Sequence, residues 1–457
     1  MKFSYKMGLS CLALLLLAGC SVPPAVSSST PVESGPVPSA VPAVAEQEQQ
    51  VESANTMPLP QQGHSALTGL ASEIAGERPV AVMLYNTPKA LAQWGIADAS
   101  VLVEACSEGQ STALMAVYES VHQLGKVGPV GQGRDQLAQM VLPLNAILAM
   151  VGRDFYTNQL LNYYDWQPVD GTYVGTLGFE MDPGRATASS QQYSWSTRTD
   201  LLNQSLAQYG QTSQGQPHSL FLFGEAKADN KQGQVLTIQY GSQRATQLAY
   251  RKEQNAYQMM YKSGESWVPQ TDANRAPGED AVYLDNVFLL MGASGYKDNG
   301  VTRQFDFEEG VGVYLHKGSM QPILWKKGQA DQPLRLYQMD GTELTVQPGK
   351  SYIGLYGGWE GQGIWLSDEQ GVAVELPQQP APLPTPTPSP TPEPTPEPTP
   401  EPTPEPTPEV TPVPADVAQP APAPEGEATP APQPEVTPEP VVEQPQPETP
   451  AEQPAQA

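Results

Sequence analysis

Cys106, Glu104 and His122 are the side chains whose types could support nucleophilic catalysis. A thiol with an imidazole base and a carboxylate to orient that base can attack a carbonyl carbon. Glu104 and Cys106 lie two residues apart in an apolar run, so they share one face of a predicted strand. No predicted helix N-terminus or cationic neighbour lowers the pKa of the thiol. We therefore interpret Cys106 as a buried thiol that packs as a small apolar side chain.

Metal and phosphate chemistry find little support in the spacing of the residues. His64, His122, His218 and His316 are far apart and have no paired cysteine near them. We therefore expect no metal and no other cofactor. Gly131-Gln132-Gly133 follows a predicted strand, but the third glycine of a dinucleotide fingerprint is absent there. We interpret this segment as a tight turn.

Two other groups of residues permit sugar chemistry or sugar binding. Asp306, Glu308 and Glu309 could supply the paired carboxylates of a glycosidase, although acids clustered on an exposed turn are normally solvated. Six tryptophans could stack on sugars, and core packing is the default interpretation for them. They are Trp166, Trp195, Trp267, Trp325, Trp359 and Trp365.

The N-terminus has the features of an export signal. Lys2 and Lys6 precede a short apolar run from Cys11 to Leu17, which is too short to span a membrane. The run ends in Leu-Leu-Ala-Gly-Cys at Cys20 and resembles the lipobox of bacterial lipoproteins. That resemblance implies a signal peptide over 1–19 and a diacylglyceryl lipid on the thiol of Cys20. It places the protein outside the cytoplasm, anchored to the outer face of the cytoplasmic membrane. The alternative is an ordinary signal peptide with an incidental cysteine.

Both flanks of the chain are predicted to be disordered. Residues 20–76 form a lipidated linker with no basic residue, rich in Pro, Ser, Val, Ala and Gln. Residues 377–457 hold 30 prolines and 13 acidic residues and lack lysine and arginine. Such a segment cannot bury enough apolar surface to offset its ordering entropy. We interpret this acidic Pro-rich tail as a spacer, with a polyproline ligand for a partner as the alternative.

The segment between these flanks has 31 acidic and 21 basic residues, a balance of −10. This acidic surface argues against nucleic acid as a partner, which would require a basic stripe. Attachment to the membrane must then come from the lipid on Cys20, since two acyl chains suffice for a stable anchor.

An α/β N-terminal domain is predicted over 77–217. Short apolar runs at 79–85, 100–105 and 112–118 indicate buried strands. Apolar residues at three- and four-residue spacing predict a helix from Asp135, as its N-cap, to residue 151, with a kink or break at Pro143. A second helix is predicted from Thr199 or Asp200 to 209, with Gly210 after it.

A mostly antiparallel β domain is predicted over 218–376, so the fold class is α+β. Asp340-Gly341 is a strong hairpin signal between two of its strands. The candidate strands lie at 219–223, 235–240, 256–261, 281–291, 312–316, 335–339, 343–346 and 352–356.

The order of residues across this segment resembles the YerB-like bacterial lipoproteins, which carry the domain of unknown function 3048. In the first half the resemblance lies in Arg78 to Met83, Asn86, Glu104, Leu114 to Tyr118, Gly128-Pro129-Val130 and Arg134. In the second half it lies in Tyr250-Arg251, Asn286-Val287, Trp325-Lys326 and Pro348-Gly349-Lys350. The resemblance implies a secreted, lipid-anchored protein and assigns no catalytic residue.

This chain departs from the family pattern at two arginines. It has Thr112-Ala113 where the family usually has Thr-Arg, and Gly131 follows Gly128-Pro129-Val130 where the family usually has arginine. Arg134 remains. Arginine suits the bidentate capture of carboxylate or phosphate, so an anionic ligand would be held weakly or not at all here.

Arg134 and Asp135 are our candidate anion-binding residues. An Arg-Asp pair after strands is similar to cell-wall polymer transferases of the LytR-CpsA-Psr type, in which it holds a polyprenyl pyrophosphate and Mg²⁺. A clamp of that kind needs more cations than this chain offers.

We expect a lipid-anchored cell-envelope protein of unassigned activity, most simply a non-enzymatic binding or scaffolding module. Its partners would be the membrane, through the lipid on Cys20, and a cell-wall polymer or another envelope protein. The alternative is an enzyme or binder that acts on an anionic cell-wall polymer or its polyprenyl-pyrophosphate carrier.

Overall fold

The computed structural model describes residues 58–109, 111–187, 190–226, 231–242, 244–359 and 361–378. These residues belong to one compact unit. The predicted signal peptide, Cys20 and almost all of the predicted tail lie outside the described residues. The predicted linker boundary at residue 76 is too late, because Leu67 is fully buried. Backbone hydrogen bonds also join Leu220 N to Ala66 O (2.9 Å) and Gly349 N to Thr68 O (2.8 Å).

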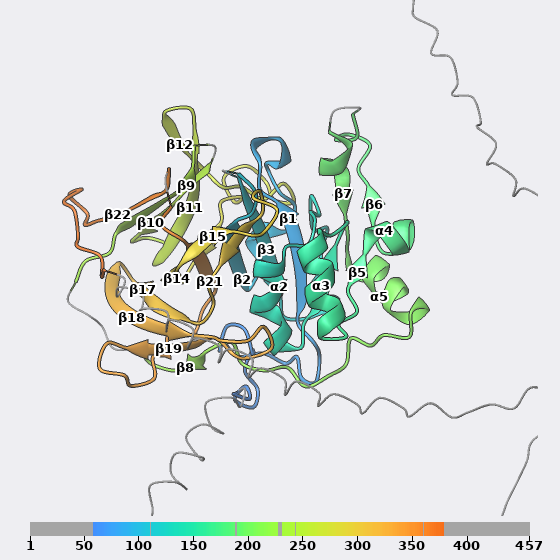
Figure 1. Cartoon of the computed structure of the whole chain (residues 1–457), viewed down its shortest axis with the longest axis horizontal. Helices are drawn as coiled ribbons and strands as arrows, with labels where there is room; N and C mark the ends of the chain where they lie inside the picture. Colours follow the sequence, from blue (N-terminus) through green and yellow to red (C-terminus); the bar gives the residue numbers. More distant parts are fainter. Residues whose placement is uncertain are drawn as a thin grey trace, which may run out of the picture. The chain divides into compact units, whose positions relative to one another are not determined.

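A mixed ten-stranded sheet runs through the unit (Figure 1). β21 is parallel to both of its neighbours, β2 and β14. The sheet therefore continues across the predicted domain boundary between residues 217 and 218. In spatial order its strands are β19 (Arg335–Gln338), β18 (Ser319–Lys326), β17 (Glu309–His316), β14 (Asn286–Met291), β21 (Ser351–Tyr356), β2 (Val101–Cys106), β3 (Thr112–Tyr118), β1 (Val80–Tyr85), β4 (Ile147–Met150) and β5 (Val169–Asp170).

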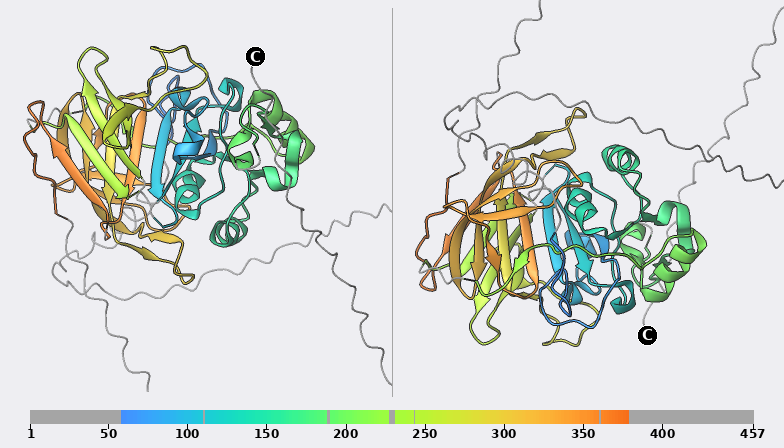
Figure 2. Two further views of the ribbon diagram at one scale, coloured as in Figure 1. Left: turned by 90° about the horizontal axis from the view of Figure 1, so that it is seen from above. Right: turned by 90° about the horizontal axis from the view of Figure 1, so that it is seen from below.

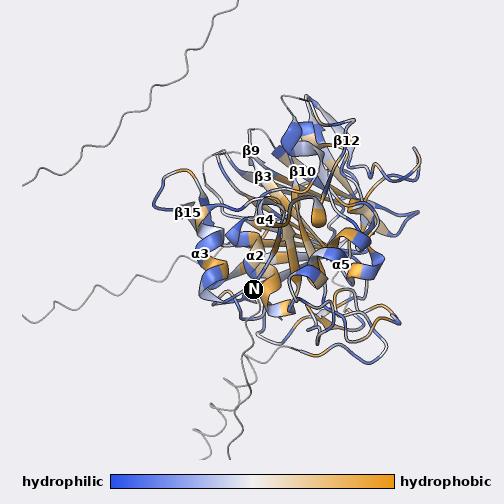
Figure 3. Cartoon of the chain, turned by 90° about the vertical axis from the view of Figure 1, so that its right-hand side faces the viewer, coloured by the Kyte–Doolittle hydropathy of each residue, from blue (hydrophilic) through white to orange (hydrophobic). Residues whose placement is uncertain are grey.

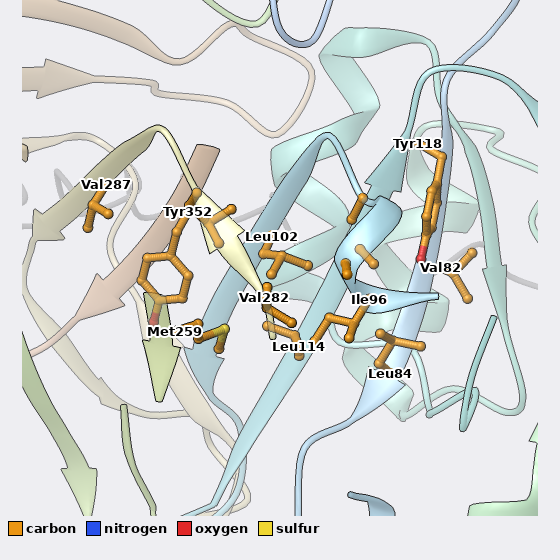
Figure 4. Close-up of a cluster of buried hydrophobic side chains, with 14 of the residues drawn as sticks. Val82, Leu84, Ile96, Leu102, Leu114, Tyr118, Met259, Val282, Val287 and Tyr352 are labelled. Atoms are coloured by element: carbon orange, nitrogen blue, oxygen red, sulfur yellow. The ribbon is translucent and has the colours of Figure 1, made fainter. Parts of the chain in front are cut away.

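A second, antiparallel sheet packs on one face of the first. Its strands are β12 (Ser266–Pro269), β11 (Ala256–Ser263), β10 (Arg244–Arg251), β9 (Val235–Gly241) and β22 (Gly363–Ser367), with β13 (Tyr283–Leu284) beside β11. Figure 4 shows the cluster between the sheets, where Leu102 and Leu114 lie near Met259 and Val282. Three two-stranded sheets complete the β structure: β15 (Ser294–Tyr296) with β16 (Arg303–Phe305), β8 (Leu222–Phe223) with β20 (Thr345–Val346), and β6 (Glu180–Met181) with β7 (Trp195–Ser196).

The helices lie around the end of the large sheet that holds β1, β4 and β5 (Figure 2). The described α-helices are α2 (Asp135–Val141), α3 (Phe155–Tyr163), α4 (Gly171–Val174) and α5 (Thr199–Gln208). Leu137 and Leu161 of α2 and α3 pack with Met83 on the face opposite the second sheet. Figure 3 shows the helices turning their hydrophilic sides outward. Single 3₁₀ turns lie at η1 (Pro88–Ala90), η2 (Ile96–Asp98), η3 (Val121–Gln123), η4 (Leu142–Leu144), η5 (Gly175–Leu177) and η6 (Gln191–Ser194).

The α+β class and most of the predicted strands are confirmed. The second predicted helix is α5, and Gly210 after it adopts the left-handed region (φ 63°) that glycine favours. The prediction for 135–151 is wrong in two respects. Asp135 is the first helical residue rather than the N-cap, which is Arg134. The helix ends at Val141, and Ile147–Met150 is a strand because it pairs in parallel with β1.

Candidate functional site

Glu104 lies at the centre of a fully buried polar cluster. Its side chain stands on the face of β2 that meets the second sheet, and it is 0% exposed. Within the first sheet, Oε1 accepts hydrogen bonds from Asn86 Nδ2 (2.8 Å) and from Thr112 Oγ1 (2.8 Å). Asn86 directly follows β1 and Thr112 begins β3, and the sheet order at this point is β2-β3-β1.

The opposite side of the same carboxylate is bound by residues of the C-terminal half. Arg244 Nε lies 3.3 Å from Oε1, and Thr246 Oγ1 donates to Oε2 at 2.9 Å, both from β10. The Tyr352 hydroxyl of β21 donates to Oε2 at 2.8 Å. Five donors therefore occupy the two oxygens, which fits a structural anion that joins the sheets better than an acid or base awaiting substrate.

Cys106 and His122 lie at opposite ends of the β2–β3 hairpin. Cys106 pairs with Thr112 at the first residue of β3, whereas His122 lies in η3, four residues after the end of that strand. A strand of this length spans roughly 20 Å, so the imidazole cannot reach the thiol. Cys106 is buried, and this desolvation raises the pKa of the thiol to about 11. The thiol is therefore protonated near neutral pH and is no nucleophile there.

Arg134 lines a hollow of about 370 Å³ beside the ends of β1 and β3. Its Nη2 forms an ion pair with Glu108 Oε1 at 2.9 Å, and both Nη atoms donate to Gln132 Oε1 at 3.2 Å. Arg134 is mostly buried, with 11% of its side chain exposed. The guanidinium that sequence analysis selected is therefore already neutralised by a carboxylate in the same hollow.

Both positions where the family pattern carries additional arginines lie at this hollow. Ala113 is part of its lining. Gly131 lies beside it, and a Cβ there would stand 2.9 Å from Tyr85 N. A larger residue at 131 would thus require a backbone shift, whereas position 113 opens into the hollow. The two positions that sequence analysis singled out thus lie at or beside one hollow, in which Arg134 is the arginine present.

Asp135 points to a different hollow from that of Arg134. Its Oδ2 accepts a hydrogen bond from Lys297 Nζ at 2.5 Å, and its side chain lines a groove that α2 and α3 form with residues 328–330 and Lys297. Burial raises the pKa of this carboxyl, and the charge of Lys297 opposes that shift. The structure therefore does not bring Arg134 and Asp135 together, since adjacent residues at a helix start point in different directions.

The remaining sequence candidates have ordinary structural roles. The backbone amides of Gly131 and Gly133 already donate to Met83 O (2.7 Å) and Gly152 O (2.9 Å), so they cannot form a phosphate-binding loop. Asp306 Oδ1 accepts from Glu308 N within a turn, and Glu309 pairs with Lys326 at 2.9 Å. Among the described residues, no group of three or more His, Cys, Asp or Glu side chains is placed to hold a metal.

These six of the chain's seven tryptophans do not share a surface. Trp325 is fully buried and donates to Met291 O (3.1 Å) and Val311 O (3.0 Å), and the Trp359 ring lies 4.2 Å from the guanidinium of Arg303. Trp365 is 58% exposed on β22, at the edge of the second sheet. None of the six lines the groove beside α3 or the hollow of Arg134.

These features define a two-sheet α+β module whose sheets are joined through a buried carboxylate. The chain belongs to the family of proteins of unknown function that carries the DUF3048 domains. The N-terminal domain of this family matches residues 67–213, and the C-terminal domain matches residues 236–353. No helix in the described part of the chain has the length and apolar character needed to cross a bilayer.

The chain is also similar to a protein of Bacillus subtilis (strain 168) named "Putative lipoprotein YerB". The two are 27% identical over 300 residues, which are 63% of this chain and 85% of the relative. The crystal structure of YerB protein from Bacillus subtilis has the same fold, with a TM-score of 0.57 and 23% identity. The structural match covers 66% of this chain and 99% of the crystallised chain.

Replacing Glu104 with alanine is predicted to lower the free energy of unfolding by about 3–5 kcal/mol, because it leaves the buried Arg244 without its counter-ion. Urea unfolding of the full-length protein, followed by tryptophan fluorescence, measures the change. Glu108→Ala is the matched control. The Glu108 side chain is 45% exposed in its ion pair, so this change should lower the free energy of unfolding by less than about 1 kcal/mol. Equal losses in the two variants would contradict the central role of Glu104.

Proposed function

We propose that this protein is a lipoprotein that holds a non-catalytic binding or scaffolding module at the outer face of the cytoplasmic membrane. A diacylglyceryl lipid on Cys20, after cleavage of residues 1–19, would be its anchor. The lipobox-like run before Cys20 and the name of the Bacillus subtilis relative support this assignment. The linker after Cys20 would act as a tether, and residues 377–457 as an acidic Pro-rich spacer.

One observation carries the non-catalytic part of the proposal: Glu104, Arg134 and Cys106, which we considered for nucleophilic or anion chemistry, are already bound by other residues or buried. Glu104 accepts five hydrogen bonds, and Arg134 is paired with Glu108. Cys106 is buried in the protonated state, because burial raises its thiol pKa to about 11. A nucleophile, base or anion-binding group must be free at its reaction site, and none of these three groups is free. The partner would be a cell-wall polymer or another envelope protein.

The proposal predicts that the full-length protein, purified in detergent, co-sediments with isolated cell walls and leaves their polymers unchanged. Bound protein is measured in the pellet, and released or transferred polymer in the supernatant by mass spectrometry. Release of wall fragments, or transfer of polymer between carriers, would contradict the non-catalytic assignment. Failure to co-sediment, with no other envelope protein captured by cross-linking in cells, would contradict the binding role.

The anchor is tested by Cys20→Ser, which removes the acceptor thiol. We expect the wild-type protein to enter the detergent phase in Triton X-114 partition and the variant to enter the aqueous phase. The reason is that the two acyl chains on Cys20 are the proposed membrane anchor, and the variant lacks them. Cys106→Ala, which alters the buried thiol, should partition as the wild type does. A wild-type protein whose mature N-terminus carries no lipid by mass spectrometry would overturn the anchor.

The alternative function, capture of an anionic polymer or pyrophosphate carrier, is tested at the hollow of Arg134. Ala113→Arg combined with Glu108→Gln adds one cation and removes the competing carboxylate. We expect pyrophosphate binding by calorimetry to improve roughly ten- to hundredfold over the wild type, since hydrogen bonds to charged groups contribute about 1.5–3 kcal/mol. Ala113→Arg alone should give an intermediate gain. Tight pyrophosphate binding by the wild type would instead favour the alternative function.

A further inference from the structure

An open groove separates helices α2 and α3 from the loops of the C-terminal half. Its main hollow has a volume of about 840 Å³, within the range of ligand sites. A second hollow of about 540 Å³ continues past the β15–β16 hairpin. Both share Asp135, Gln139, Lys297 and Gln329 in their linings. The groove is thus elongated, with Asp135 near its middle, and it is distinct from the hollow of Arg134.

Aromatic rings follow the side of the groove formed by α3 and the residue after it. Tyr163 is 82% exposed, and its ring packs edge-to-face on Tyr164 at 4.9 Å. Tyr156 is held by a hydrogen bond from its hydroxyl to Asp298 and by Lys297 Nζ at 4.7 Å from its ring centroid. Tyr163 thus presents an open ring in the lining of the groove, which a ligand with a flat apolar face would cover.

Neutral amides supply most of the other polar groups of the main hollow. They are Gln139, Gln159, Asn162 and Gln329. Each primary amide offers two donors and one acceptor oxygen, which suits neighbouring hydroxyl or acetamido groups of a sugar. A pyranose has an apolar face and an edge of hydroxyl groups. Aromatic rings can stack on the face, and amides can form hydrogen bonds with the edge.

Asp135 provides an unused acceptor at the junction of the two hollows. Its side chain is 7% exposed, and Lys297 binds only Oδ2. Oδ1 is buried and accepts no hydrogen bond from the described residues. A buried acceptor without a donor costs free energy, so a ligand donor at this point would be favoured.

We propose that this groove binds an uncharged glycan chain. The inference rests on the proposed binding function and names its ligand class. Charge favours this class over an anionic polymer. Asp306 and Glu308 line the second hollow, and the only cation in either lining, Lys297, is already paired with Asp135. A phosphate-rich chain would meet unpaired carboxylates there, whereas a neutral sugar meets rings, amides and the free oxygen of Asp135.

The probe is the N-acetylglucosamine tetrasaccharide, titrated by calorimetry into the full-length protein in detergent. We expect saturable binding that Tyr163→Ala weakens about tenfold, the scale of one well-placed aromatic contact. Tyr209→Ala is the matched control, because Tyr209 is 53% exposed at the end of α5 and does not line the groove. A glycerol-phosphate polymer should not displace the sugar. Both tyrosines are exposed, so neither variant should lose its fold.

Equal affinity of the Tyr163→Ala and Tyr209→Ala variants would overturn the inference, as would displacement of the sugar by the glycerol-phosphate polymer. Competition with isolated cell walls separates the two levels of the proposal. If the protein sediments with walls but the tetrasaccharide neither binds nor competes, the glycan assignment fails and the binding function stands. If the tetrasaccharide displaces the protein from walls and Tyr163→Ala reduces sedimentation, both are supported.

Discussion

A single buried carboxylate imposes the main constraint on this fold. Glu104 is fully removed from water, and a charge in that position persists only where donors surround it. The donors come from both sheets, so the sheets must close on each other before the cluster is complete. Replacing such a cluster with apolar residues often costs little stability, which suggests that its main effect is to select one alignment of β10 over β2. Its position also explains why an acidic residue can stand on an otherwise apolar strand.

The same constraint unites the two halves of the chain. β21 lies between β14 and β2, and its Tyr352 donates to Glu104. A strand from near residue 350 thus completes a sheet begun by residues 80–118. Asp272 also joins the two halves of the chain, because its two carboxylate oxygens accept hydrogen bonds from Gly95 N and Ala97 N, both at 2.9 Å. The N- and C-terminal domains of the family are therefore consecutive in sequence but share one sheet, so neither half has a complete sheet by itself.

The sequence pattern predicted the elements that depend on residues close together in the chain. Apolar runs bounded by turns predicted β1, β2 and β3, and the glycine at 210 predicted the end of α5. Residues 147–150 show the limit, since an apolar run fits a helix and a buried strand equally well and only the pairing with β1 distinguishes them. Strand β10 was missed because it begins with Arg244, a charge that is acceptable in a core only beside Glu104. The groove was missed because its residues are distant in sequence: Tyr163 and Lys297 are 134 positions apart, and only the tertiary fold brings them to one groove.

The charge of the molecule and the proposed ligand are physically consistent. The segment 77–376 carries a balance of −10, and both flanks add acidic residues. A polyanion that approaches such a surface is repelled over about one Debye length, roughly 8 Å at physiological ionic strength. Stacking and amide hydrogen bonds with a neutral sugar act at contact distance and depend little on salt. The acidic surface would then exclude anionic polymers while it leaves neutral chains free to bind, so that specificity comes from repulsion as well as from contact. Restoring positive charge at Ala113 changes only the hollow of Arg134, which is lined by different residues, and therefore should leave binding in the groove unchanged.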